Sequence, residues 1–355
     1  MHRVLHVITP SRIAGAETYL TRLLLRSDHA TTLNHCIVSS NSAVGPEMGL
    51  TGASVHLVGV NGKANPMALY RLSQVAREFE ADLVHSHLSS ASWWSGWLDT
   101  LGGPKSIGHV HGFTSAMWHR RQTHLIACSG AVRDHLTSNG IKHNRITVLY
   151  PPVDFHDLHR TKSRDAIRSE FGVGPETFVV GTAAHLSVKK GYRELIQAAI
   201  QVLRERPEVQ FWCFGEGPLR LELETTARSA GIADRFRLLG FRRDIVDLMD
   251  AIDVMALPSH REPFGLVYVE AALCNRPVIA CDAGGAPEIV LNGETGLLIP
   301  PHDADRLAQA ILKMLHDPAS RDEMGRRGRQ LALERFGWRQ HLQSLTNLYE
   351  RVAAA

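Results

Sequence analysis

The sequence predicts an α/β protein built from two doubly wound domains in tandem. Short apolar runs alternate with helix-length amphipathic segments from one end of the chain to the other. The pair Pro151-Pro152 interrupts this alternation, because prolines cannot continue the interior of a sheet. A length of 355 residues also exceeds one average domain and fits two. We therefore predict a first domain over residues 1–152, a second over 153–336 and a terminal segment over 337–355.

The first half contains apolar runs of strand length, several of them separated by segments with helical periodicity. This alternation predicts a parallel sheet with helices on both faces. Ser129 is a suitable N-cap for the last of the helices. The predicted strands are Val4–Ile8, Cys36–Ser39, Val55–Val58, Leu83–His85, Ser106–Val110, Leu125–Cys128 and Thr147–Tyr150. The predicted helices are Ala16–Leu25, Met67–Phe79 and Ala131–Ser138.

The second half repeats the alternation after the two prolines and predicts a second parallel sheet. In such a pair of domains a ligand is expected at the carboxyl ends of the strands, in the cleft between the domains. The predicted strands are Phe178–Thr182, Gln210–Phe214, Phe236–Leu239, Val254–Leu257, Val278–Ala280 and Gly296–Ile299. The predicted helices are Tyr192–Leu203, Leu219–Ala230, Ile245–Ala251, Leu266–Leu273 and Ala304–Leu315.

Composition places the chain among ordinary globular proteins, with 44% hydrophobic residues and 21% charged residues. The five cysteines are scattered and show no CxxC spacing, which favours reduced thiols over a disulfide framework or a zinc site. The chain opens directly on an apolar strand, and no apolar run reaches the roughly 20 residues that span a bilayer. We therefore expect a cytoplasmic protein without a signal peptide or a membrane span.

The chemistry is concentrated around two glutamates, Glu262 and Glu270, which lie in a loop and in the helix that follows it. Gly265 lets backbone N–H groups at the start of that helix approach a ligand, and the helix dipole there favours a phosphate. Glu270 suits hydrogen bonds from a ribose diol, and Glu262 would lie nearer a sugar. A purely structural interpretation also stands, with Glu262 at a favourable helix N-terminus and Glu270 on a solvated face.

The surrounding motifs decide between these interpretations. Pro258-Ser259 precedes the pair, and Pro277-Val278, Gly284-Gly285-Ala286-Pro287-Glu288 and Gly293-Glu294-Thr295-Gly296 follow it. In order and spacing this run resembles the nucleotide-sugar site of the retaining glycosyltransferases known as group 1 or family 4. The resemblance covers nearly the whole chain. It implies the GT-B fold, in which two Rossmann-like domains face each other across a cleft and a C-terminal helix crosses back to the first domain.

The resemblance assigns the donor site residue by residue. Lys190-Gly191 stands where the family has the lysine of a phosphate clamp, and His185 replaces the family's arginine. Gly215-Glu216-Gly217-Pro218 resembles a turn at the edge of the nucleotide pocket, and Phe241 follows the strand that meets the base. The implied donor-binding residues are Gly15, His185, Lys190, Gly215, Phe241, Glu262, Phe264, Gly265, Leu266, Val267 and Glu270.

Two first-domain motifs complete the implied site. The loop Ile13-Ala14-Gly15-Ala16-Glu17 resembles the family's "GGAE" loop, with Ala14 in place of one glycine. Gly108-His109-Val110-His111-Gly112 resembles a strand end whose histidine, here His111, faces the transferred sugar. The resemblance thus implies His111, Glu262 and Lys190 as catalytic residues, with no metal and no cofactor beyond the nucleotide-sugar substrate.

Other activities remain alternatives at this stage. His85-Ser86-His87 and His109-Val110-His111 are H-x-H pairs, and residues two apart on a strand point the same way, so each pair suits a metal and a metal-dependent hydrolase. A nucleotide-sugar epimerase or hydrolase on the same fold is a further alternative. Asp303-Ala304-Asp305 has the form of a metal-binding D-x-D motif, but its position predicts that Asp303 is a helix N-cap.

The acceptor is the least specified part of the reaction. Trp93, Trp94, Trp97 and the run Trp118-His119-Arg120-Arg121 suggest a basic aromatic patch in the first domain. Such a patch suits a sugar face or a membrane interface near a lipid-linked acceptor. We expect transfer of a hexose-type sugar to a saccharide or lipid-linked acceptor in polysaccharide or glycolipid biosynthesis. The expected partners are a nucleotide sugar, this acceptor and the inner membrane face as a peripheral contact, with no nucleic acid.

Overall fold

The computed structural model describes residues 2–9, 15–27, 33–39, 52–60, 62–153 and 160–354. The chain divides into two compact units. Unit 1 comprises Met1–Pro152 together with Trp338–Ala355, and unit 2 comprises Val153–Gly337. Each unit contains one sheet of its own.

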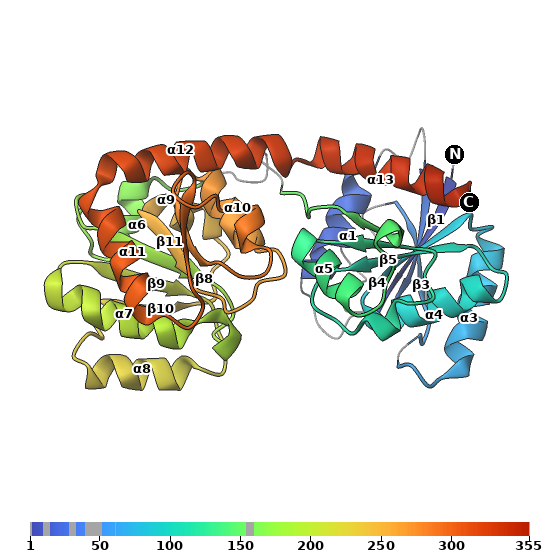
Figure 1. The fold of residues 1–355 in the computed structure, drawn as a ribbon, viewed down its shortest axis with the longest axis horizontal. Helices are drawn as coiled ribbons and strands as arrows, with labels where there is room; N and C mark the ends of the chain where they lie inside the picture. Colours follow the sequence, from blue (N-terminus) through green and yellow to red (C-terminus); the bar gives the residue numbers. More distant parts are fainter. Residues whose placement is uncertain are drawn as a thin grey trace. The chain divides into compact units, whose positions relative to one another are not determined.

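Unit 1 is built on a seven-stranded parallel sheet of order β3-β2-β1-β4-β5-β6-β7, with helices on both of its faces (Figure 1). The strands are β1 (His2–Ile8), β2 (Leu33–Ser39), β3 (Ser54–Leu57), β4 (Leu83–His87), β5 (Lys105–Val110), β6 (His124–Ala127) and β7 (Ile146–Val148). The helices are α1 (Gly15–Arg26), α3 (Pro66–Glu78), α4 (Ser89–Thr100), α5 (Gly130–Ser138), α13 (Trp338–Ala353) and the 3-10 turns η2 (Ala116–Trp118) and η3 (His143–Arg145).

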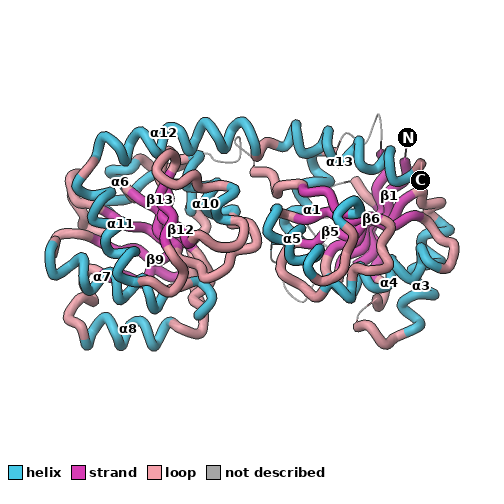
Figure 2. The backbone as a smooth tube through the Cα atoms, viewed as in Figure 1, coloured by secondary structure: helices cyan, strands magenta, loops and turns pink. Residues whose placement is uncertain are grey.

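Unit 2 has a six-stranded parallel sheet of order β10-β9-β8-β11-β12-β13, whose strands again form a layer among helices (Figure 2). The strands are β8 (Val179–Ala183), β9 (Gln210–Phe214), β10 (Phe236–Gly240), β11 (Val254–Leu257), β12 (Val278–Cys281) and β13 (Gly296–Ile299). The helices are α6 (Arg164–Glu170), α7 (Tyr192–Glu205), α8 (Arg220–Ser229), α9 (Ile245–Ala251), α10 (Leu266–Leu273), α11 (Ala304–His316), α12 (Pro318–Arg335), η4 (Val188–Lys190) and η5 (Ala286–Glu288).

Every strand and helix predicted above overlaps an observed element of the same type, and the α/β class with two parallel sheets is confirmed. Three α-helices in the described part of the chain were not predicted, namely α4, α6 and α12. Among the described residues, no helix combines the length and the apolarity that a bilayer crossing requires.

The sheet of unit 1 is covered on both faces, which explains why its central strands are buried and largely apolar, apart from buried histidines and serines on β1, β4 and β5. On one face Val4 packs with Leu20 of α1 and Leu348 of α13. On the other face Val84 packs with Leu72 of α3 among the side chains of a second cluster. Helix α13 is therefore an integral part of the core of unit 1.

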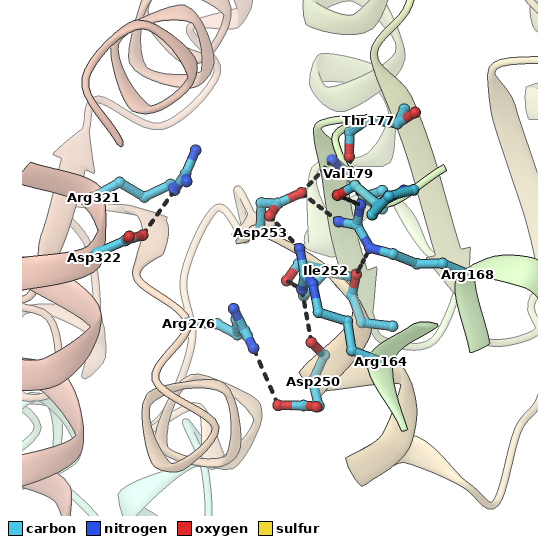
Figure 3. Close-up of polar contacts among 12 residues, drawn as sticks. Arg164, Arg168, Thr177, Val179, Asp250, Ile252, Asp253, Arg276, Arg321 and Asp322 are labelled. Atoms are coloured by element: carbon cyan, nitrogen blue, oxygen red, sulfur yellow. Dashed lines mark hydrogen bonds and ion pairs between the residues drawn. The ribbon is translucent and has the colours of Figure 1, made fainter. Parts of the chain in front are cut away.

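The core of unit 2 includes a buried charge network at the start of β11 (Figure 3). Both oxygens of Asp253 are used, since Oδ1 accepts from Arg164 at 2.5 Å and Oδ2 accepts from Arg168 at 2.7 Å. The Arg168 side chain is only 1% exposed, and its remaining donors reach carbonyl oxygens, including that of Ala251 at 3.0 Å. The Val179 amide also donates to Asp253, at 2.8 Å. This network joins α6 to the ends of two central strands.

Replacing Asp253 by asparagine should therefore destabilise unit 2 strongly. Asp253→Asn leaves the buried Arg168 guanidinium without its counter-charge, and we expect a loss of about 3–5 kcal/mol in the free energy of unfolding. The matched control is Asp322→Asn, which breaks the Arg321–Asp322 pair of Figure 3 at its exposed carboxylate and should cost less than about 1 kcal/mol. Urea unfolding of both variants measures the difference, and equal costs would contradict this account of the network.

Candidate active site

The strand order of unit 2 reverses between β8 and β11. Chain connections run outward from β8 to β9 and β10 on one side, and from β11 to β12 and β13 on the other. Parallel sheets bind ligands beyond the carboxyl ends of the strands at such a reversal. The loops that leave β8 and β11 therefore define where a ligand site is expected in this unit.

These two loops are joined by an ion pair. Lys190, at the end of η4, places its Nζ 2.6 Å from Oε2 of Glu262, in the loop after β11. The two side chains are 19% and 12% exposed, so the pair is largely withdrawn from water. The amide of His260 also donates to the carbonyl of Lys189 at 3.0 Å. The structure thus brings together two of the three residues expected to be catalytic.

Glycines make this approach of the loops possible. Gly191 has φ of 71°, and a Cβ there would lie 2.0 Å from the carbonyl oxygen of Pro258. Gly265 has φ of 106°, and a Cβ there would lie 2.4 Å from the ring of Tyr268 and 3.3 Å from Cγ of Glu262. A larger residue at Gly191 would push the two loops apart, and one at Gly265 would clash with Tyr268 within its own segment.

The loop after β12 holds the backbone of Glu262 from the other side. The amide of Gly285 donates to the carbonyl of Glu262 at 2.7 Å, and Gly284 forms an isolated parallel bridge with Glu262. A Cβ on Gly284 would lie 2.1 Å from that same carbonyl. The Gly-Gly-x-Pro-Glu turn noted in the sequence therefore positions Glu262 through its backbone.

The loop after β9 forms the neighbouring edge of the site. The amide of Gly215 donates to the carbonyl of Gly240 at 2.7 Å. The exposed ring of His185 lies against Gly217, where a Cβ would meet Nδ1 at 2.3 Å. Phe241, just beyond β10, is 74% exposed, which leaves an aromatic face open to a ligand. Gly215, His185 and Phe241 thus all belong to loops at the carboxyl ends of the strands.

Helix α10 begins at Leu266, with Gly265 as its N-cap, directly after the loop that carries Glu262. Leu266 and Val267 are half-buried in its first turn, whereas Phe264 is buried against the ring of Phe336. The backbone amides of this turn and the ammonium of Lys190 are donors suited to a phosphate. Glu270 is half-buried and lies one turn further along the helix.

A second polar cluster, which no sequence motif indicated, lies next to this site. Oε1 of Glu194, on α7, accepts from Nε2 of His260 at 3.0 Å and from Nδ1 of His302 at 3.2 Å. Burial raises the pKa of Glu194, but hydrogen bonds to its own backbone and to His260 outweigh burial and lower the pKa. The three residues come from separate segments, and no spacing in the sequence links them.

In unit 1, His111 follows β5 and is half-buried. Its Nε2 lies 3.3 Å from Nδ1 of His87, and its ring is 5.5 Å from that of Tyr19. Burial, with a smaller contribution from the charge of His119, lowers the pKa of His111 to about 3, so the imidazole is neutral near pH 7. Gly15 is the first residue of α1, while Ile13 and Ala14 lie outside the described residues.

The other sequence motifs are placed as follows. Asp303 caps α11, since its side chain accepts from the amide of Arg306 at 2.8 Å, which confirms the capping interpretation of the D-x-D motif. The basic aromatic patch is present in part, with Arg121 stacked 3.6 Å over Trp97 and Lys63 4.0 Å over Trp118. Trp94 is buried in the core, as is His119, which hydrogen-bonds Thr114.

Two family models match successive parts of the chain. The model described as Glycosyltransferase Family 4 matches residues 13–157, and the model described as Glycosyl transferases group 1 matches residues 163–331. The first match falls in unit 1 apart from its last residues, and the second falls in unit 2.

Characterised proteins are similar over most of the chain. The GDP-mannose-dependent monoacylated alpha-(1-6)-phosphatidylinositol monomannoside mannosyltransferase of Corynebacterium glutamicum is 28% identical over 81% of this chain and 75% of its own length. The D-inositol 3-phosphate glycosyltransferase of Kineococcus radiotolerans is 30% identical over 78% of this chain and 68% of its own length.

A solved structure shares the fold. The crystal structure of Anabaena HepE in complex with UDP has a TM-score of 0.88 and 25% identity, and the match covers 98% of this chain and all of that chain. The chain therefore belongs to the group 1 / family 4 glycosyltransferases and has their GT-B fold of two Rossmann-like domains. The predicted resemblance is confirmed.

The close approach of Gly191 to the carbonyl oxygen of Pro258 can be tested by a pair of alanine substitutions. Gly231 has φ of 70°, close to that of Gly191, but nothing lies within 4 Å of the point where its Cβ would stand. Gly231→Ala should therefore cost only the roughly 1–2 kcal/mol of a left-handed conformation. Gly191→Ala adds the clash with Pro258 and should cost more in urea unfolding. Equal losses in the two variants would show that the close approach does not constrain the loops.

The buried histidines of unit 1 predict an acid-sensitive fold. Burial is the main cause that lowers the pKa of His119, His124 and His341 to about 4. In the unfolded chain a histidine titrates near pH 6.5, so below that pH the unfolded state binds protons that the folded state does not. Stability should therefore fall as the pH drops from about 6.5 to about 4, by roughly 1.4 kcal/mol per pH unit for each histidine.

Two histidine variants separate the contribution of the buried histidines to the pH dependence of stability from the contribution of the carboxylates. His124→Gln removes one buried histidine and should reduce the slope of unfolding free energy against pH. His143→Gln removes an exposed histidine and should leave the slope unchanged. If the slopes of wild type and His124→Gln coincide, buried histidines do not cause the acid sensitivity.

Proposed function

We propose that this glycosyltransferase acts with retention, moving a hexose-type sugar from a nucleotide-diphosphate sugar to a saccharide or lipid-linked acceptor. The observation that carries the proposal is the Lys190–Glu262 pair beside the start of α10, at the strand reversal of unit 2. A cation, a carboxylate and free helix amides at one strand-end site suit a ligand that has both phosphates and sugar hydroxyls.

In this proposal Lys190 and the amides of Gly265, Leu266 and Val267 bind the diphosphate. The ammonium of Lys190 would exchange its bond with Glu262 for one with a phosphate oxygen, which frees Glu262 to accept from a sugar hydroxyl. Glu270 binds the ribose diol, and the exposed ring of Phe241 lies beside the base. His185 and Gly215 complete the phosphate edge of the site.

The difficult step is the departure of the nucleotide diphosphate from the anomeric carbon. The bond from that carbon to the phosphate oxygen breaks, and negative charge develops on the diphosphate, where Lys190 and the helix amides stabilise it. The acceptor oxygen attacks the same face of the sugar and its proton passes to the leaving phosphate. The neutral imidazole of His111 orients the sugar by a hydrogen bond. No metal is needed at the diphosphate in this scheme.

The relatives narrow the donors and acceptors that are worth testing. The Corynebacterium enzyme is named for GDP-mannose and a phosphatidylinositol mannoside, and HepE was solved with UDP-glucose, at 25% identity to this chain. We therefore propose a UDP or GDP sugar as donor. The tryptophans of unit 1 with a stacked Lys63 or Arg121 suit a peripheral contact with an anionic membrane that presents a lipid-linked acceptor.

The proposed function is tested by measuring nucleotide binding and sugar transfer in the wild-type protein and in variants of the site. Thermal-shift and calorimetric titrations with UDP, GDP, ADP and their sugars, in the presence of EDTA, should show saturable stabilisation by one nucleotide family. A ligand at 100 times its Kd adds about 2.7 kcal/mol. Lys190→Ala and Glu270→Ala should lower transfer roughly 10²–10³-fold while the protein stays folded. Lys189→Ala is the matched control, because this neighbouring lysine is exposed, and it should keep full activity.

Each of the following results would contradict a different part of the proposed function. Near-normal transfer by both Lys190→Ala and Glu270→Ala would show that the donor site is wrongly assigned. Loss of nucleotide binding in EDTA, restored by Mg²⁺, would contradict the metal-free scheme. Release of free sugar at the same rate with and without acceptor would favour a hydrolase over a transferase. Inversion at the anomeric carbon, read by NMR of the product, would exclude retention.

A further inference from the structure

Three fully buried histidines meet on one face of the sheet of unit 1. His6 lies on β1, directly opposite His85 of the neighbouring strand β4, and His87 lies two residues further along β4. Residues two apart on a strand project from the same face, so the side chains of His85 and His87 share a face. The nearby rings of Tyr349 and Tyr19 come from α13 and α1, which cover that face.

The ring nitrogens of this triad are spaced as metal ligands. One nitrogen from each of His6, His85 and His87 lies within 4.8 Å of the other two. Nδ1 of His6 and Nε2 of His87 are 3.4 Å apart. Two imidazole nitrogens that bind one tetrahedral zinc ion at 2.0–2.1 Å lie roughly 3.3–3.4 Å from each other. The observed separation of these two nitrogens therefore equals the distance between two ligand nitrogens in a tetrahedral zinc site.

The opposite nitrogen of each ring has its own partner. Nδ1 of His85 is 2.6 Å from the hydroxyl of Tyr349, and Nε2 of His6 is 2.9 Å from Nδ1 of His35. Nδ1 of His87 is 3.3 Å from Nε2 of His111. Histidines that bind metals commonly donate their second N–H to such a neighbour, which fixes the tautomer and the ring orientation.

Hydrogen bonds alone do not satisfy the triad. A proton between His6 and His87 would pair those two rings, but Nε2 of His85 is buried and has no hydrogen-bond partner. A buried nitrogen without a partner is costly. A cation bound to the inward nitrogens would satisfy all three rings at once.

We propose that His6, His85 and His87 bind one divalent transition-metal ion of the zinc type. Imidazole nitrogens prefer zinc and its neighbours, whereas Mg²⁺ and Ca²⁺ prefer oxygen ligands. Three histidines leave a fourth position for water. The ion would tie β1 and β4 to α13 through Tyr349. The proposal goes beyond glycosyl transfer and does not depend on the donor site in unit 2.

Two other groups in the described chain are weaker candidates. His87, His109 and His111 also lie within ligand distance of one another, but neither nitrogen of His109 has a partner that would orient the ring. In the group of Glu194, His260 and His302, one carboxylate oxygen already accepts from both histidines. Those histidine nitrogens act as donors and offer no lone pair to a metal.

The direct test is the metal content of the full-length protein. Because the triad is fully buried, the ion should enter as the chain folds. Protein refolded with Zn²⁺ and then dialysed should retain one equivalent by elemental analysis. Protein refolded with Co²⁺ should show the intense visible absorption of a tetrahedral site. Failure of wild-type protein to retain Zn²⁺, or an octahedral Co²⁺ spectrum, would overturn the proposal.

A matched pair of tyrosine variants locates the ion without removing a ligand. Tyr349→Phe deletes the hydroxyl that orients His85 and should weaken metal binding roughly 10–100-fold. Tyr19→Phe deletes a buried hydroxyl that contacts His341 at 2.8 Å, outside the triad, and should leave metal binding unchanged. Equal effects of the two substitutions would contradict the assignment.

Ligand variants then distinguish the triad from its alternatives. His87→Gln and His6→Gln should abolish the bound equivalent, whereas His109→Gln and His302→Gln should retain it. Retention of the ion in His6→Gln together with its loss in His109→Gln would overturn the proposed ligand set. Each variant is first checked for a cooperative unfolding transition, so that a misfolded protein is not scored as metal-free.

Discussion

The site in unit 2 depends on one close backbone approach, that of Gly191 to the carbonyl of Pro258. Only a residue without a side chain fits there, since a Cβ would lie 2.0 Å from the carbonyl oxygen. This approach holds η4 against the loop after β11, so that Lys190 reaches Glu262. Gly285 in turn fixes the backbone of Glu262. The relative positions of Lys190 and Glu262 are thus fixed by three loops whose backbones pack against one another.

The proposed function requires the Lys190–Glu262 pair to exchange partners rather than to stabilise the fold. A largely buried ion pair such as Lys190–Glu262 contributes little net free energy, because desolvation offsets the attraction. Removal of either partner alone would leave the other uncompensated. When a diphosphate replaces Glu262 as the partner of Lys190, the Glu262 carboxylate needs a new donor, which in the proposed function is a sugar hydroxyl. The Arg168–Asp253 network differs, since the partners of both side chains belong to the chain itself.

The sequence predicted the elements whose signal is local. Apolar runs bounded by turn residues located every strand in the described part of the chain, and the motif of Glu262 and Gly265 could be singled out because it is contiguous. Helix α12 was not predicted, and it contains Gly325 and Gly328, which lower the helix propensity of that segment. In the structure, Gly325 instead lets α12 pack closely on the carbonyl of Asn275. Helix α4 starts at Leu88 without a side-chain cap. The Glu194–His260 contact joins residues 66 positions apart, which no local pattern reveals.

In unit 1 the register of paired strands brings together histidines that the spacing in the sequence does not link. The H-x-H pairs indicated that His85 and His87 share a face, but only the pairing of β1 with β4 places His6 opposite His85. His87 contacts both proposed sites, because its Nδ1 faces His111 while its Nε2 faces His6. An ion on Nε2 would keep the His87 proton on Nδ1, where it donates to Nε2 of His111. His111 would then carry its own proton on Nδ1 and present a donor, not an acceptor, to a sugar hydroxyl.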